Sequence, residues 1–380
     1  MHIVDTTMFY APVSGGVKRY LLAKHQWLKP CRAVHHTVLV PGRADQHDGD
    51  GLVCLASAPL PFAHGYRLPL NLPRWRAHLE ALAPDLIEAG DPYQLAWVAL
   101  RAGRNRDVPV VGFYHSDLVR LLGVRLGRWI EPAVREYVLR LYERFDLVLA
   151  PSRMIVERLE SLGLRHVRHQ PLGVDTELFS PCRRDPGLRH QLGLDPGTRL
   201  LVFAGRFARE KNIPLLAAAM RRLGPRYHLL LVGGGGPLPP LPPNVSVIPY
   251  QAAGRDVARL IASCDLLVHA GGRETFGLVV LEAMACGLPV VGVDSGAVAE
   301  LVDQEVGQVA RSDDLGSLEE AIRSVFERGP EVLGRAALER VRRRYTWGRV
   351  LRRQIAAYAE LAGVSSPLEE EPELEAHAAG

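Results

Sequence analysis

The segment from Arg273 to Gly287 holds two carboxylates in a setting where carboxylates are rare. Residues 277–286 are apolar on nearly every face, which predicts a buried helix, and Gly287 followed by Pro289 is a normal helix stop. Glu282 falls in the middle of this helix. An ionised carboxylate is costly to bury alone, so Glu282 must meet an internal donor or the hydroxyls of a bound ligand. Vicinal sugar hydroxyls would satisfy both of its oxygens.

Glu274 lies just before the same helix, whose first amides are free donors at its positive end. An anionic ligand rich in hydroxyls would therefore find partners here, and we assign Phe276, Gly277 and Leu278 to its binding. The alternative is structural. Glu282 would pair with an internal arginine, and Glu274 would face solvent near a helix N-terminus, where acidic residues are favoured anyway.

Two cations follow the predicted strand at 200–204. Gly205 and Arg206 come directly after it, and Lys211 follows within the same loop. Open α/β sheets bind ligands at the carboxyl ends of their strands, so these cations could neutralise a pyrophosphate as charge develops on it. A solvated loop with local ion pairs is the alternative. The position in the chain favours the phosphate interpretation.

Two glycine-rich segments and one histidine are further candidates. Gly15 and Gly16 separate the first apolar strand from a predicted helix, and their missing side chains let backbone amides approach an anion. The glycines at 233–236 are as permissive, but a plain loop is an equal alternative. His115 ends the apolar run 108–115. A single histidine is more often structural than catalytic, but its position opposite the phosphate loops makes it a candidate for contacting a sugar or stabilising a cationic intermediate.

Parallel sheets must position these residues, and both halves of the chain show the pattern. Short apolar runs bounded by Gly, Pro or Asp alternate with helical patterns. The predicted strands are 38–40, 52–56, 85–89, 108–115 and 147–150, then 200–204, 227–232, 245–249, 266–270 and 289–293. Predicted helices include 95–102, 133–144, 214–223 with Asn212 as cap, and 315–326 capped by Asp313–Asp314. The fold class is α/β, with two Rossmann-like doubly wound domains.

Size and composition indicate a globular protein with more than one domain. The 380 residues are too many for one simple core, and 47% hydrophobic with 23% charged residues is an ordinary globular balance. A net charge of +4 is far below what a dedicated nucleic-acid binder carries, so we expect no nucleic acid partner. Five scattered cysteines predict no disulfide framework and fit a reducing cytosol. No stretch is long and apolar enough to span a bilayer.

Together these residues resemble the retaining GT-B glycosyltransferases of family four, over residues 1–362. The motifs that carry the resemblance are Gly15-Gly16-Val17, His115, Ala150-Pro151-Ser152, Leu172-Gly173-Val174-Asp175, Gly205-Arg206 with Glu210-Lys211-Asn212, and Glu274 and Glu282 with seven residues between them. Residues 269–272 depart from it, since His-Ala-Gly-Gly stands where a Pro-Ser turn is common.

The resemblance implies two Rossmann-like domains that face each other across a cleft. Residues 1–180 would form the acceptor-side domain and 181–345 the nucleotide-sugar domain. A helix at 346–363 would return to the first domain, and the acidic tail 364–380 would be disordered.

The resemblance also implies roles for the residues. Arg206 and Lys211 would hold the pyrophosphate, Glu282 the ribose and Glu274 the donor sugar. His115 would sit beside the reacting centre, and Gly15 and Gly16 would approach the phosphates as the domains close. Front-face attack, assisted by the leaving phosphate, would retain the anomeric configuration. Neither a metal nor a cofactor is implied, only a GDP-mannose or UDP-sugar co-substrate.

The expected activity is transfer of a hexose, with mannose as the best guess, to a lipid or glycan acceptor. A nucleotide-sugar epimerase and a non-catalytic nucleotide-sugar-binding protein are the alternatives. An NAD dehydrogenase is disfavoured, because no third spaced glycine follows Gly15 and Gly16. We expect a cytoplasmic protein. The arginine-rich stretch 117–145 leaves open whether it rests peripherally on the inner face of a membrane or presents a solvated helical surface.

Overall fold

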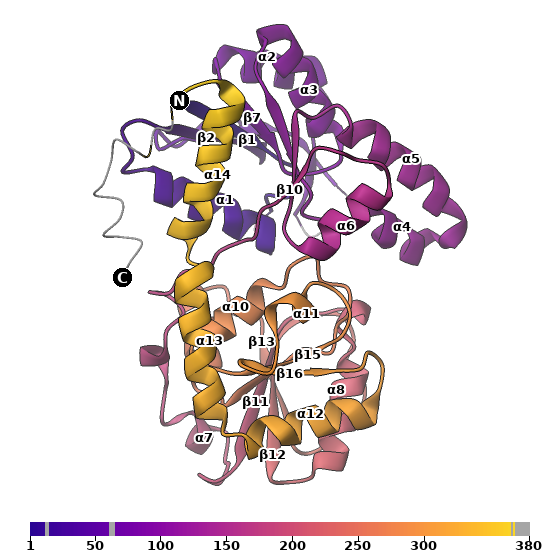
Figure 1. Cartoon of the computed structure of the whole chain (residues 1–380), viewed down its shortest axis with the longest axis vertical. Coiled ribbons are helices and arrows are strands. Elements are labelled where there is room, and N and C mark those ends of the chain that lie inside the picture. Colours follow the sequence, from indigo (N-terminus) through magenta and orange to yellow (C-terminus); the bar gives the residue numbers. More distant parts are fainter. Residues whose placement is uncertain (12–14, 61–64, 366–367, 369–380) are drawn as a thin grey trace. The chain divides into compact units, whose positions relative to one another are not determined.

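The structure, a computed structural model, describes residues 1–11, 15–60, 65–365 and 368. The chain divides into two compact units (Figure 1). One contains residues 1–172 and the segment that begins at Trp347, and the other contains Gly173–Thr346. Both units are of the α/β type, each built on a largely parallel sheet, as the alternating sequence pattern predicts.

The first unit has an eight-stranded sheet of order β10-β9-β8-β7-β1-β2-β4-β3, parallel except where β3 meets β4. The strands are β1 (His2–Thr6), β2 (His35–Gly42), β3 (Gln46–His47), β4 (Leu52–Ala56), β7 (Leu86–Ala89), β8 (Val110–Phe113), β9 (Leu147–Ala150) and β10 (Val167–His169), with a separate pair β5 (Ala58–Pro59) and β6 (Arg67–Leu68). The helices are α1 (Gly16–Leu28), α2 (Leu72–Ala81), α3 (Gln94–Arg106), α4 (Leu118–Leu126), η1 (Arg128–Ile130), α5 (Glu131–Tyr142), α6 (Arg153–Ser161) and α14 (Trp347–Ala362).

The second unit has a six-stranded parallel sheet of order β13-β12-β11-β14-β15-β16. The strands are β11 (Arg199–Phe207), β12 (Tyr227–Gly235), β13 (Val245–Pro249), β14 (Leu266–Val268), β15 (Val290–Val293) and β16 (Gly307–Ala310). The helices are η2 (Pro181–Arg183), α7 (Leu188–Gln191), η3 (Arg209–Lys211), α8 (Ile213–Leu223), α9 (Gly254–Ala262), α10 (Leu278–Ala285), α11 (Val298–Leu301), α12 (Leu315–Glu327) and α13 (Pro330–Arg344).

Two predicted helix caps and one possible loop can be compared with the structure, and the outcomes differ. Asp314 caps α12 as predicted, because its Oδ1 accepts from the Ser317 amide at 2.9 Å. Asn212 stands at the N-cap position of α8, with a left-handed backbone at φ 51°, but its side chain makes no capping hydrogen bond. Its Nδ2 instead donates to Asp313 at 2.8 Å. The glycines after Val232 are not a plain loop either. β12 continues to Gly235, where it pairs with Phe207 of β11.

A buried cluster of charged and polar side chains holds α14 to the first sheet. Lys24 of α1 lies 2.8 Å from Asp5 of β1 and 2.5 Å from Glu88 of β7, and all three side chains are at most 1% exposed. Gln354 of α14 donates to Glu88 at 3.2 Å, and the Tyr358 hydroxyl also bonds to Glu88. In Figure 1, α14 is the yellow helix beside α1. The C-terminal helix is thus bonded to the centre of the first unit.

This cluster predicts a large loss of stability on removing its one lysine. Lys24→Met leaves Asp5 buried without its cation, and breaking a buried pair in this way costs about 3–5 kcal/mol. Urea unfolding measures the effect. The control is Lys29→Met, which removes an ion pair to Asp50 whose side chains are 56% and 63% exposed, and which should cost about 0–1 kcal/mol. If both variants lost the same small amount of unfolding free energy, the cluster would not be important for stability.

Candidate functional site

The sheet of the second unit has a switch point between β11 and β14. From β11 the chain proceeds outward through β12 and β13, and from β14 it proceeds the other way through β15 and β16. Ligands of open α/β sheets bind outside the carboxyl ends of the two strands at such a point. Arg206 lies at that end of β11, and His269 and Glu274 follow β14. The predicted phosphate and sugar residues are therefore brought to one edge of the sheet.

Lys211, His269 and Glu274 form a cluster at this edge. The Lys211 ammonium contacts Oε1 of Glu274, and Nε2 of His269 lies 3.1 Å from the same oxygen. The side chains of Lys211 and Glu274 are 16% and 20% exposed, whereas that of His269 is 1% exposed. The predicted phosphate cation and the predicted sugar carboxylate are thus direct neighbours, and both reach solvent.

Gly271 allows this cluster to form. A Cβ atom at position 271 would lie 2.7 Å from the Glu210 carbonyl oxygen and 3.1 Å from the Lys211 Cα. A side chain there would push the loop after β14 away from η3, because these two neighbours are backbone atoms. It would also press on the His269 ring, whose Cε1 would lie 3.0 Å from the added Cβ. In the sequence, Gly271 is visible only as a departure from the family pattern, because its closeness to η3 depends on contacts between segments that are far apart in the chain.

The protonation states at the cluster follow from burial. Burial, with some help from Arg206, lowers the pKa of Lys211 to about 8, while Glu210 opposes the shift. The adjacent Glu274 carboxylate also favours the charged ammonium, because an opposite charge stabilises it. Burial and the neighbouring Lys211 lower the pKa of His269 to about 3, so its ring is neutral at physiological pH.

Arg206 is placed differently from Lys211. Its side chain is 76% exposed, and its partner is Glu210 at 3.5 Å, four residues later. Exposed pairs of this kind contribute little to stability. The guanidinium can therefore leave Glu210 for a ligand at small cost, as the assignment to a pyrophosphate requires.

The helix α10 is as apolar as the sequence predicts, and it buries a carboxylate. Glu282 is 4% exposed between buried neighbours such as Leu281 and Ala283. Gly277 precedes the helix with φ 96°, a conformation that other residues rarely adopt. Phe276 beside it is 4% exposed, and Leu278 begins the helix. The first amides of α10 therefore lie at the carboxyl side of the sheet, close in sequence to Glu274.

The remaining predicted residues belong to the first unit. Gly15 precedes α1 and Gly16 begins it, with open space around the position of a Gly15 side chain; Ser14 lies outside the described residues. His115 follows β8, and its ring stacks on Phe113 with centroids 4.0 Å apart. Burial lowers the pKa of His115 to about 3, with Asp5 opposing the shift, so this ring is also neutral.

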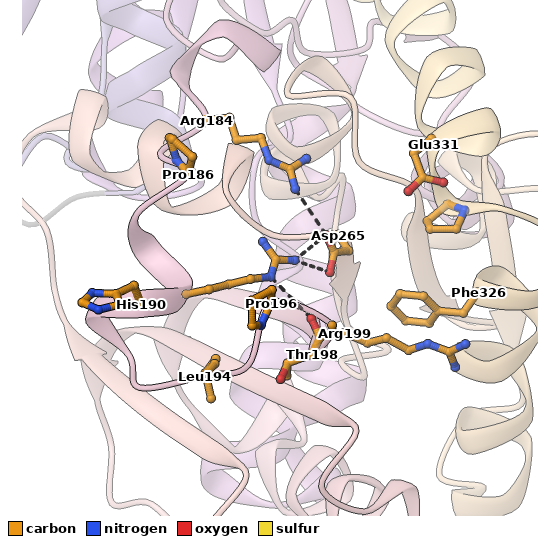
Figure 2. A pocket seen from close by; sticks show the side chains of 13 residues that line it. Arg184, Pro186, His190, Leu194, Pro196, Thr198, Arg199, Asp265, Phe326 and Glu331 are labelled. Carbon is orange, nitrogen blue, oxygen red and sulfur yellow. Dashed lines mark hydrogen bonds and ion pairs between the residues drawn. The ribbon is translucent and has the colours of Figure 1, made fainter.

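A cavity of about 580 Å³ in the second unit lies at the opposite end of its sheet (Figure 2). Arg199, which begins β11, and Asp265, which precedes β14, line it. Arg189 donates to both oxygens of Asp265 at 2.7 and 2.6 Å, and Arg184 lies 3.7 Å from the same carboxylate. Because it faces the amino ends of the strands, this cavity is separate from the candidate site.

The arginine-rich stretch of the first unit exposes apolar side chains. Trp129 is 78% exposed, and Leu126, Val124 and Leu121 are 53%, 51% and 39% exposed. The Arg128 side chain beside them is 92% exposed. None of the helices in the described ranges combines the length and the apolarity needed to cross a membrane.

Comparison with known proteins identifies the family. Residues 14–178 match Glycosyltransferase Family 4, and residues 186–340 match Glycosyl transferases group 1. A GDP-mannose-dependent alpha-mannosyltransferase of Mycobacterium tuberculosis is 31% identical over 288 residues, which cover 72% of this chain and 75% of the relative. The chain belongs to the glycosyltransferases that combine a Glycosyltransferase Family 4 domain with a Glycosyl transferases group 1 domain.

A longer match and two solved structures agree with this glycosyltransferase assignment. A GDP-mannose-dependent alpha-(1-6)-phosphatidylinositol dimannoside mannosyltransferase of M. tuberculosis is 29% identical over 376 residues, covering 95% of this chain and 97% of the relative. Sucrose-phosphate synthase of Thermosynechococcus elongatus superposes with a TM-score of 0.78 at 21% identity, over 96% of this chain and 100% of that one. HepE of Anabaena, in complex with UDP-glucose, superposes with a TM-score of 0.73 at 22% identity, over 95% of this chain and 99% of that one. The GT-B fold class is confirmed.

The close approach at Gly271 predicts that Gly271→Ala impairs glycosyl transfer. The added methyl group must displace backbone of η3, and with it Lys211, from Glu274. We expect a loss of activity of about tenfold or more, since misplacement of about 1 Å can cost 100-fold. Initial rates of transfer measure it. Gly197→Ala is the matched control, because a Cβ at position 197 meets nothing within 4 Å. Equal activity in the two variants would show that the approach at Gly271 does not matter.

Proposed function

We propose that this glycosyltransferase moves mannose from GDP-mannose to a lipid or glycan acceptor, with retention of configuration and without a metal ion. The observation that carries the proposal is the contact between Lys211 and Glu274 at the switch point of the second sheet, beside the N-terminus of α10. A cation for a diphosphate and a carboxylate for sugar hydroxyls stand there side by side. The two mycobacterial relatives, both GDP-mannose-dependent mannosyltransferases by name, support the choice of donor.

The charges of the site suit a departing nucleoside diphosphate. Negative charge grows on the diphosphate as the bond to the sugar breaks, and Arg206, Lys211 and the first amides of α10 supply positive charge at that edge of the sheet. Arg206 needs only to leave Glu210, a partly exposed partner, to take part. In this proposal these groups provide the electrostatic stabilisation that a metal ion gives in other transferases.

The carboxylates suit the two sugar rings of the donor. Glu282 is buried in α10, where its oxygens can accept from the ribose hydroxyls. Glu274 is partly exposed and can accept from the hydroxyls of the transferred hexose. The assignments of Gly15, Gly16 and His115 to the donor stay predictions that a bound donor would test.

The side chains exposed on α4 and η1 support a lipid acceptor. Residues 117–145 contain six arginines and four acidic residues, and the apolar side chains exposed among them include Leu126 and Trp129. Basic and apolar side chains on one surface favour an anionic lipid interface, where the first attract headgroups and the second enter the acyl region. The relative whose printed name specifies phosphatidylinositol dimannoside also supports a lipid acceptor.

Substitution of the two central residues tests the donor assignment. Glu274→Ala should lower transfer by about 100-fold or more, since it removes a group at the reacting centre, while binding of GDP stays near the wild-type level. Lys211→Ala should weaken both transfer and GDP binding, because its cation meets the diphosphate. Transfer is followed with labelled GDP-mannose, and binding by calorimetry.

Product analysis in the same assay separates the alternatives. An epimerase would change the sugar without consuming an acceptor, and a non-catalytic protein would bind the donor and release it unchanged. Tighter binding of UDP or ADP sugars than of GDP-mannose would overturn the choice of donor. Wild-type transfer by both variants would overturn the assignment of the site.

Binding to vesicles tests whether the surface of α4 and η1 contacts a membrane, as a lipid acceptor would require. The double variant L126S/W129S removes two exposed apolar side chains, each worth about 1.5–3 kcal/mol when fully buried, so affinity for anionic phospholipid vesicles should fall about tenfold or more. Leu70→Ser is the control, since Leu70 is 70% exposed but lies outside residues 117–145. Cosedimentation measures both. Binding that is equal in both variants, or equal for neutral and anionic vesicles, would count against this surface.

A further inference from the structure

His269 is fixed at the carboxyl end of β14, at the switch point of the second sheet. Its amide donates to the Val291 carbonyl at 2.8 Å, which continues the pairing with β15. Its ring lies 6.1 Å from the ring of Phe203 on β11, and the side chain is 1% exposed. Backbone and ring are both held by the sheet. The imidazole therefore offers a fixed donor or acceptor to whatever lies next to it.

The neighbour of this ring is the Glu274 carboxylate. Nε2 lies 3.1 Å from Oε1, and an ionised carboxylate only accepts hydrogen bonds, so Nε2 carries the proton and donates. Burial and Lys211 lower the pKa of His269 to about 3, which agrees with a neutral ring bearing one proton. A hydrogen bond to a charged acceptor is shorter and stronger than one between neutral groups. His269 thus restrains Glu274 without adding a charge.

The two donors to Glu274 share one oxygen. The Lys211 ammonium and the His269 imidazole both contact Oε1, and within the described residues Oε2 accepts no hydrogen bond. With the Glu274 side chain 20% exposed, Oε2 is left to meet a ligand. A flexible carboxylate would lose rotamer freedom on binding a sugar hydroxyl. Two fixed donors on Oε1 remove part of that cost before the ligand arrives.

We propose that His269 is a positioning residue of the donor-sugar site: its Nε2–H holds Oε1 of Glu274, so that Oε2 is aimed at a hydroxyl of the transferred hexose. This inference rests on the proposed function, in which Glu274 binds the donor sugar. It gives a physical role to the segment 269–272. Gly271 brings the loop to η3, and His269 orients the carboxylate that the loop carries.

Three variants test the role of His269. His269→Leu removes the donor, and should lower kcat/KM for GDP-mannose about 10- to 100-fold, the scale of a hydrogen bond to a charged group. GDP binding should be unchanged, because GDP lacks the hexose. His269→Gln can donate from its own Nε2 and should restore most of the activity. His228→Leu is the control, since His228 is 6% exposed, bonds to Ser246 at 2.8 Å and lies near the amino end of β12.

The outcomes separate failure of this inference from failure of the proposed function. If Glu274→Ala is impaired while His269→Leu transfers like the wild type, only the positioning role is overturned. If His269→Leu loses GDP binding and transfer together, or Gln fails to restore transfer, His269 acts on the fold or the phosphate site and the inference is again wrong. If the wild-type protein transfers from no nucleotide sugar, the proposed function itself fails.

Nuclear magnetic resonance of the wild-type protein gives a test that does not depend on transfer activity. The ¹⁵N shifts of the His269 ring, assigned by their loss in His269→Gln, should report a proton on Nε2 and none on Nδ1. The ring should not titrate between about pH 5 and 8, the range in which unperturbed histidines change charge. A proton on Nδ1, or a titration in that range, would overturn the inference.

Discussion

The candidate site depends on how closely the loop after β14 approaches η3. Glu274 and Lys211 are far apart in the sequence and reach each other because Gly271 leaves room for the Glu210 carbonyl and the Lys211 backbone. Once the loop is there, one oxygen of Glu274 receives two donors, and the other accepts no hydrogen bond from the part of the chain that the structure describes. The arrangement fixes a charged group before any ligand binds, and preorganisation of this kind lowers the cost of binding.

Burial tunes the charges around this contact. Lys211 loses part of its preference for the charged form on burial, whereas Arg206 stays exposed and charged. His269 is neutral because it is buried next to an ammonium. The site therefore combines an arginine that is always charged, a lysine whose charged form the neighbouring carboxylates favour, and a neutral histidine that donates a hydrogen bond. A diphosphate would add the negative charge that favours the protonated form of Lys211.

Much of this could be predicted from local patterns, and the rest depends on contacts between distant segments. Apolar runs predicted strands such as β4, β9 and β13 with the bounds that the structure gives. The burial of Glu282 followed from the apolar helix around it. In contrast, Asn212 fits a capping pattern, yet its side chain bonds to Asp313, which lies 101 residues away. The contacts of His269 and Gly271 could not be predicted for the same reason, because nothing in their local sequence shows what lies beside them.

The ion pairs of the two units differ in how deeply they are buried, and this difference matches a structural role in the first unit and a binding role in the second. In the first unit Lys24 bonds to both Asp5 and Glu88, all three side chains are almost wholly buried, and Glu88 also bonds to Gln354 of α14. Charges enclosed in this way are available to no ligand, and their strong mutual contacts hold one helix in one place. In the second unit Lys211 and Glu274 keep some exposure, so the same kind of ion pair can exchange its partner for a ligand. The degree of enclosure, more than the residue types, therefore decides which ion pair secures the fold and which can act on a substrate.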